Sequence, residues 1–231
     1  MKKLSILTII MVLSLGTMYG QKNKQKDKTM SNQTEKVSYF LGAEVGTYYR
    51  TNKIEINSDK FTQGFVDALA DKANFTEEEK QEIIAILQKM QQEAAQEMIK
   101  ENKEIGRKFL EENKKNKDVK ETASGLQYKV VKSSESGVSP KATDQVKVHY
   151  HGTLIDGTVF DSSVQRGQDI TFGLNQVIRG WTEGLQLMKT GEKFIFYIPS
   201  DLAYGDQGAG QQIPGGTTLI FEVELFEVNP E

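Results

Sequence analysis

The sequence predicts an α+β protein, with an all-α amino-terminal half and a long connecting helix before a half made of antiparallel strands around one short helix. Two observations predict this class. The four prolines lie at or after Pro140, which leaves the preceding chain free to form long uninterrupted helices. From Thr122 onward the spacing of apolar residues changes from a period near 3.6 to a period of 2, which is the change from helix to strand.

The composition bounds the class of protein. With 231 residues, of which 37% are hydrophobic, the chain is long enough to bury a core of its own. A formal net charge of −3 gives no reason to expect a nucleic-acid partner. The absence of cysteine excludes disulfides, a thiolate nucleophile and a zinc-thiolate site.

The first 20 residues have the pattern of an export signal. Lys2 and Lys3 precede the apolar run Leu4–Leu15, which is too short for a stable membrane anchor. We expect a signal peptide over residues 1–20 and a flexible, lysine-rich leader over residues 21–34; an uncleaved anchor is the alternative. Cleavage would leave no membrane span and place the protein in the periplasm first, with secretion or surface association as further possibilities.

Two short helices open the predicted helical region. Apolar residues recur with a helical period over Glu35–Tyr49 and again over Ser58–Ala70. Ser58 is a suitable N-cap for the second of these helices, because its hydroxyl oxygen is able to accept a hydrogen bond from a free backbone N–H.

A third helix is predicted over residues 76–117. Thr76 and Glu79 form a capping box at its start, and the helical pattern continues to about Lys117. From Lys100 onward the composition is mostly Lys, Glu and Asn, so we expect this half to be a solvated stalk. Gly106 lies inside it and weakens the helix by about 1 kcal/mol relative to alanine.

The helical region over residues 35–98 carries few apolar residues for a core of its own. Burial against a second copy is a more economical solution than an isolated bundle. We therefore predict a homodimer that forms through these helices. A monomeric three-helix bundle is the alternative.

The second half of the chain, residues 118–231, is predicted to form a mostly antiparallel sheet. Its strand-like segments are rich in Val, Ile, Phe and Tyr, and short turns connect most of them. The segments are Leu126–Val131, Val146–Leu154, Val159–Phe160, Phe194–Ile198 and Leu219–Val228. Asp156 and Gly157 form a strong hairpin signal between the second and third segments.

The sole tryptophan stands at the start of the one helix predicted in this half. Trp181, Leu185 and Met188 follow the spacing i, i+4, i+7 and share one helix face. A short helix that lies on a strongly curved sheet, with a large aromatic residue at one end, forms a shallow apolar cup. The alternative is that Trp181 is an ordinary core residue.

Four motifs in this half resemble one known family. In chain order they are Val148–Ser163, Val177–Trp181, Ala203–Gly205 and Leu219–Leu225. Together they are similar to the FKBP-type peptidyl-prolyl cis-trans isomerases. The helical half together with Thr122–Tyr128 resembles the dimeric, exported subgroup typified by macrophage infectivity potentiator-like proteins.

The resemblance implies a half-barrel of antiparallel strands wrapped around the short helix, with an aromatic cup that receives a substrate proline ring. It implies a floor from Trp181 and a backbone N–H of Ile178 that binds a substrate carbonyl. The positions that match catalytic positions of the family are Tyr150, Phe160, Asp161, Val177, Ile178, Trp181, Tyr204 and Phe221.

Three further positions are predicted to contact substrate, namely Ile170, Phe172 and Ile213. Ile170 stands where many family members have a second aromatic wall. Ala209 falls near a loop position that is often histidine. Both departures put affinity and the preferred proline-flanking residue in doubt more than activity.

The resemblance implies no cofactor and no metal, because an X–Pro bond isomerises without a nucleophile once the barrier of roughly 18–20 kcal/mol is lowered. The expected partners are proline-containing unfolded or partly folded polypeptides, with the macrolide inhibitors of the family as candidate ligands. His149 and His151 lie on one face of a strand and leave zinc binding open as an alternative. Asp161 has the alternative role of capping the turn at Ser162 and Ser163.

Two kinds of function therefore remain. The first is an enzyme that accelerates X–Pro isomerisation and assists the folding of exported proteins. The second is an ATP-independent dimeric holdase that grips unfolded chains between its two arms and for which catalysis is incidental.

Overall fold

The computed structural model describes residues 32–230 and divides into two compact units, Met1–Val45 and Gly46–Glu231. The predicted signal peptide and almost all of the predicted leader lie outside the described residues. In the first unit, the described part is mainly the beginning of helix α1 (Gln33–Thr51). The remainder of α1 and all the other elements belong to the second unit.

Helix α2 (Ser58–Leu69) forms where the apolar period predicted it, but its N-cap differs from the prediction. Asn57, not Ser58, is the N-cap: its side-chain oxygen accepts a hydrogen bond of 2.9 Å from the backbone N–H of Lys60. Asn and Ser are comparably good caps, and Asn57 has the extended backbone that a cap requires. The prediction of Ser58 as the cap was therefore wrong by one residue.

Helix α3 (Glu77–Asn113) begins at the predicted capping box. The backbone N–H of Thr76 donates to Glu79 at 2.7 Å, and the N–H of Glu79 donates to the Thr76 hydroxyl at 3.1 Å. The helix is continuous through Gly106 but ends at Asn113, short of the predicted end. Its last turn is fixed by the sheet, because Gln127 Nε2 donates 2.9 Å to the carbonyl of Leu110.

From Lys100 onward most residues of α3 are exposed, as expected for a stalk, but one face of this part packs against the second half of the chain. Gly106 is the buried residue of this helix. A Cβ atom at Gly106 would lie 2.3 Å from Thr218 Oγ1, so the absence of a side chain permits the close approach of helix and loop. Phe109 packs against Tyr197 of the sheet, with ring centroids 5.9 Å apart. Gly106 is thus a docking point rather than a weak point.

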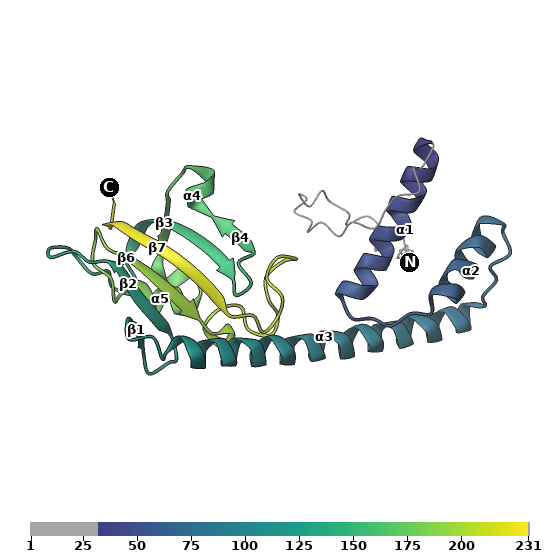
Figure 1. Cartoon of the computed structure of the whole chain (residues 1–231), viewed down its shortest axis with the longest axis horizontal. Helices are drawn as coiled ribbons and strands as arrows, with labels where there is room; N and C mark the ends of the chain where they lie inside the picture. The colour runs from purple at the N-terminus through teal and green to yellow at the C-terminus, as the bar shows by residue number, and fades with distance from the viewer. Residues whose placement is uncertain (1–31, 231) are drawn as a thin grey trace. The chain divides into compact units, whose positions relative to one another are not determined.

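The second half of the chain forms one sheet of seven strands, all paired antiparallel (Figure 1). The order is β1-β2-β6-β7-β3-β4, and β5 pairs with β3 beside β4. The strands are β1 (Val119–Glu121), β2 (Gln127–Lys132), β3 (Gln145–Leu154), β4 (Val159–Ser162), β5 (Ile170–Gly173), β6 (Lys193–Ile198) and β7 (Leu219–Val228). The sequence pattern predicted five of these strands and missed the short β1 and β5.

The predicted hairpin joins β3 to β4. Gly157 has φ +86°, a conformation that side chains disfavour, and the N–H of Leu154 donates 2.9 Å to the carbonyl of Thr158. Past the hairpin, Ser162 caps the short helix α4 (Ser163–Arg166). Further along, the 3-10 turn η2 (Leu174–Gln176) leads into α5 (Arg179–Leu185), and η3 (Ser200–Leu202) follows β6.

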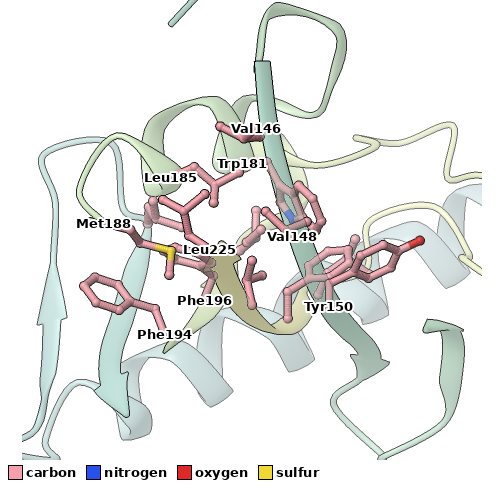
Figure 2. Close-up of a cluster of buried hydrophobic side chains, with 14 of the residues drawn as sticks. Val146, Val148, Tyr150, Trp181, Leu185, Met188, Phe194, Phe196 and Leu225 are labelled. Carbon is pink, nitrogen blue, oxygen red and sulfur yellow. The ribbon is translucent and has the colours of Figure 1, made fainter. Parts of the chain in front are cut away.

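Helix α5 packs against the sheet at β6 and buries its predicted face. Trp181 is 5% exposed, and Leu185 and Met188 are fully buried (Figure 2). Two glycines let the helix approach β6: a Cβ at Gly180 would lie 2.4 Å from Ile198, and one at Gly184 would lie 2.7 Å from the Phe196 ring. This close packing fixes the position of Trp181 relative to the strands.

Within residues 32–230, no helix is both long enough and apolar enough to cross a membrane.

Candidate active site

A cavity of about 740 Å³ opens between α5, the concave face of the sheet and the loop after η3. We refer to this cavity as the cup. It is lined by Tyr150, Phe160, Asp161, Ile170, Phe172, Gln176, Val177, Ile178, Trp181, Tyr204, Ala209, Gln212, Ile213 and Phe221. All eleven residues that the sequence singled out for the site lie in this lining.

Trp181 is the centre of an aromatic cluster. Its ring centroid lies 5.3 Å from Tyr150, 5.3 Å from Phe172 and 5.0 Å from Phe221. The contacts with Tyr150 and Phe221 are edge-to-face, a favoured geometry for aromatic pairs. The cluster forms because β3, β5, β7 and α5 each contribute one ring to the same side of the sheet.

The second wall depends on a glycine of β3. Phe160 and Phe221 meet edge-to-face with centroids 5.3 Å apart. A Cβ at Gly152 would lie 2.7 Å from the Phe160 ring and 2.8 Å from the Phe221 ring. Gly152 therefore leaves the space that both rings occupy.

A polar triad stands at the edge of the cup. The Tyr150 hydroxyl donates to Asp161, and Arg166 forms an ion pair with the same carboxylate. Arg166 also donates 2.9 Å to the Tyr150 hydroxyl, and its guanidinium lies over the Tyr150 ring. Asp161 therefore holds Tyr150 and Arg166 in place, while the cap of the following turn is Ser162.

The triad fixes the protonation of the site. Burial raises the pKa of Tyr150, and its hydrogen bond to Asp161 raises that pKa further. Burial alone would raise the pKa of Asp161, but hydrogen bonds from Tyr150 and Arg166 outweigh it, and the pKa is lowered. Burial, together with the charge of Asp161, raises the pKa of Tyr204.

These shifts predict a flat pH profile for activity. Tyr150, Asp161 and Tyr204 are the titratable residues of the cup lining within the described chain. With ordinary pKa values of about 3.9 for Asp and about 10 for Tyr, and shifts that move them apart, none titrates between about pH 5 and pH 9. If the cup catalyses the X–Pro isomerisation that the resemblance implies, kcat/KM for an X–Pro peptide is constant over this range. A bell-shaped profile centred near neutrality would contradict the account.

Asp161 also makes the stability of the fold depend on pH at the acid end. Because the folded-state pKa of Asp161 is lowered, its ionised form stabilises the fold above the ordinary carboxyl pKa of about 3.9. This contribution is lost as the pH falls through the lowered folded-state value.

Ile178 is the N-cap of α5. A backbone N–H at this position has no acceptor within the helix, so it is a suitable donor for a ligand carbonyl. Val177 precedes it in an extended conformation at the same lip of the cup.

The structure also identifies residues that sequence reasoning missed or left without a role. Gln176 and Gln212 place side-chain amides in the lining, and Ala209 contributes a small side chain. Arg166 was missed because its signal, a cation five residues after Asp161, depends on the one-turn helix α4 to bring the two together. Ile170, which stands at the family's second aromatic wall, is 37% exposed in the lining.

Each of the two histidines lies within hydrogen-bond distance of a serine hydroxyl. Their Nδ1 atoms lie 3.0 Å from Ser163 Oγ for His149 and 2.9 Å from Ser162 Oγ for His151. In residues 32–230, no group of three or more metal-binding side chains is arranged to hold a metal ion.

Comparison with known proteins identifies the family. Residues 137–226 match the model of the FKBP-type peptidyl-prolyl cis-trans isomerase domain, and residues 34–130 match the domain amino-terminal to such isomerases. The chain is 42% identical to a probable FKBP-type peptidyl-prolyl cis-trans isomerase of Haemophilus influenzae, covering 100% of this chain and 97% of the relative. The chain belongs to the FKBP-type peptidyl-prolyl cis-trans isomerases.

Other relatives agree with this assignment. The isomerase is 44% identical to FkpA of Aeromonas hydrophila, over 84% of this chain and 76% of the relative. The crystal structure of FkpA from Escherichia coli superposes with a TM-score of 0.67 at 37% identity, covering 87% of this chain and 99% of that one. The predicted fold class and enzyme class are confirmed, and the relatives' names favour the isomerase over the holdase alternative.

Proposed function

We propose that the cup is the catalytic site and that Trp181 is the floor on which the substrate proline ring rests. In this proposal Tyr150, Phe160 and Phe221 form the aromatic walls, and the remaining cup residues predicted from the sequence contact the chain on either side. The observation that carries the proposal is the aromatic cluster around Trp181 at the base of an open cavity.

Catalysis in such a cup is differential binding. The planar X–Pro amide is the more polar form, so removal of water raises its free energy relative to the twisted transition state. The N–H of Ile178 and the hydroxyl of Tyr204 hold polar groups of the substrate during the twist. No side chain needs to attack or deprotonate the substrate.

The floor offers one more donor. Trp181 Nε1 is the buried side-chain nitrogen or oxygen without a hydrogen-bond partner in residues 32–230. A buried unpaired donor costs about 1–3 kcal/mol, which a ligand acceptor would recover. This cost supports a binding role for Trp181 in addition to its packing role.

A fluorescence titration tests the binding role. Because Trp181 is the sole tryptophan, a proline peptide that enters the cup should shift its emission saturably. A macrolide inhibitor of the family, which we propose binds the same cup, should displace the peptide competitively. An emission that does not respond to either ligand would contradict this assignment.

We propose that the protein is a homodimer that forms through residues 35–98, ahead of an isomerase domain over residues 118–231. The helices expose large apolar side chains that a soluble monomer would leave in water. On α2, Phe65 is 59% exposed and Leu69 is 76% exposed. A second copy presents the same face, so a symmetric interface buries both.

Two charged substitutions on α2 test whether this helix lies in the dimer interface. Phe65→Glu combined with Leu69→Glu would place carboxylates inside an apolar interface, and the apparent mass in sedimentation should fall from two chains to one. Lys60→Glu, on the opposite side of α2, is the control and should leave the dimer intact. A wild-type protein that sediments as a single chain at micromolar concentration would overturn the proposal.

We propose that the protein is exported, with Met1–Gly20 removed and the periplasm as its main location. The pattern of Lys2, Lys3 and the apolar run that follows supports export. One relative, 38% identical, is named outer membrane protein MIP of Legionella longbeachae. Mass spectrometry of the protein from a periplasmic fraction should show an amino terminus near residue 21.

A further inference from the structure

The loop between η3 and β7 has two sides with different neighbours. One side lines the cup through Tyr204, Ala209, Gln212 and Ile213. The other side lies against helix α3, as the position of the loop along α3 in Figure 1 shows. A single loop therefore separates the long helix from the site of catalysis.

The loop is folded back on itself as two arms. The N–H of Gly216 donates 2.8 Å to the carbonyl of Gly205 at the base, and Ala209 and Ile213 form a small antiparallel bridge near the tip. At Gly215 a Cβ would lie 2.1 Å from the carbonyl oxygen of Asp206, so the two arms touch. Movement of either arm therefore moves the tip residues that line the cup.

Helix α3 presents one face to both arms. Ile99, Asn102, Lys103 and Gly106 follow the spacing i, i+3, i+4, i+7, which is one side of a helix. Asn102 Nδ2 donates 2.9 Å to the carbonyl of Gly215 on the returning arm. Lys103 Nζ lies 2.5 Å from Asp206 Oδ1 on the outgoing arm.

The backbones of helix and loop approach too closely for other residues. Gly216 has φ +76°, and a Cβ there would lie 2.6 Å from the carbonyl oxygen of Ile99. About two turns beyond Ile99, a Cβ at Gly106 would lie 2.3 Å from the side-chain Oγ1 of Thr218. The contact between α3 and the loop therefore depends on the close approach at these glycines as well as on the two polar contacts. Asn102 and Lys103 hold the loop in one position along the helix.

We propose that Asn102 and Lys103 are positioning residues of the isomerase. By holding one arm of the loop each, they place Tyr204 and Ile213 against the substrate chain beside the proline. The long helix is thus part of the catalytic apparatus rather than a spacer. The effect falls on substrate binding, because the aromatic floor and walls do not depend on this loop.

Two substitutions that keep side-chain size test this role. Asn102→Leu removes the donor, and Lys103→Met removes the charge but retains the stem. The combined variant should lower kcat/KM for an X–Pro peptide by about three- to tenfold, the size expected for one hydrogen bond and one exposed ion pair. Most of the loss should appear as a higher KM, and Lys103→Arg should retain activity.

Matched controls lie on the same helix. Gln96→Leu and Lys100→Met make the same chemical changes at exposed positions, and Lys100 pairs with Glu97 of its own helix at 3.8 Å. Both should leave kcat, KM and the melting temperature unchanged. An equal loss in these controls would show that the helix surface in general, rather than the loop contact, governs activity.

A double-mutant cycle with Ile213→Ala separates positioning from general stabilisation. If the helix residues act through the loop, their substitution should have a smaller effect once Ile213 is truncated, because only the part that acts through Tyr204 remains. Losses that multiply fully with Ile213→Ala, or a wild-type kcat/KM in the combined Asn102 and Lys103 variant, would overturn the proposal. A loss that follows the fraction of unfolded protein would overturn it as well.

Discussion

Trp181→Leu should lower kcat/KM for an X–Pro peptide by at least about tenfold. Leucine removes the indole on which the proline ring is proposed to rest, which is the centre of three ring contacts of 5.0–5.3 Å, and it removes the unpaired Nε1 donor. Such a donor contributes about 1–3 kcal/mol when it pairs with an acceptor, and about 1.4 kcal/mol gained in the transition state corresponds to a factor of ten in rate. A protease-coupled assay measures the change.

The control for this variant is Leu187→Ala. Leu187 lies two residues after the end of α5 but is 41% exposed, so its truncation should change the rate by less than about twofold. Circular dichroism should show that both variants are folded. A Trp181→Leu protein with wild-type kcat/KM would mean that the indole is not the floor of the catalytic site.

Gly184→Ala should destabilise the isomerase domain although it replaces glycine in a helix. Helix propensity alone would favour alanine by about 1 kcal/mol. The added Cβ would lie 2.7 Å from the fully buried ring of Phe196, which has no space to move. Overpacking of this kind costs about 1–3 kcal/mol, and we expect a net fall in melting temperature of several degrees.

The matched control is Gly64→Ala in α2, where nothing other than the neighbouring residues and the backbone of the same helix lies within 4 Å of the added Cβ. Here propensity alone acts, so the melting temperature should stay the same or rise. If Gly184→Ala were as stable as Gly64→Ala, the close packing of α5 on β6 would not be the feature that fixes Trp181.

The cup was predictable from the sequence because its residues lie in strongly patterned elements. The helical spacing of Trp181 and Leu185 placed the indole on the buried face of α5, and alternation identified β3 as a strand, while the resemblance to a family assigned Tyr150 to the site. The resemblance to a family then assigned residues of distant segments, such as Phe221 of β7 and Tyr204 of the loop after η3, to one site. Periodicity alone would have left these segments unconnected.

The docking of α3 was not predictable by the same reasoning. Its contact face with the loop is Ile99, Asn102, Lys103 and Gly106, and a single apolar residue among polar and small ones does not form the apolar stripe that predicts a buried face. The loop between η3 and β7 explains the contact, because its glycines leave backbone carbonyl groups accessible and let the helix approach closely. This loop has few apolar side chains that would pair with an apolar helix face. Only the three-dimensional arrangement joins the two.

Arg166 illustrates a second limit. Its contacts with Asp161 and Tyr150 require α4 to form and to end at Gly167, which has φ +68°. A helix of one turn produces no detectable period, so the sequence gives no element on which to place the guanidinium. Polar partners at the ends of short elements are for this reason harder to predict than aromatic walls.

We propose that an aromatic cup around Trp181 catalyses X–Pro isomerisation without a reactive group or metal. The most direct measurement is the cis–trans exchange rate of a short X–Pro peptide by NMR exchange spectroscopy, with and without the protein, in excess chelator. We expect the exchange to be accelerated in proportion to protein concentration, with no loss in the chelator and with most of the acceleration lost in Trp181→Leu. An exchange rate unchanged by the folded protein would contradict it.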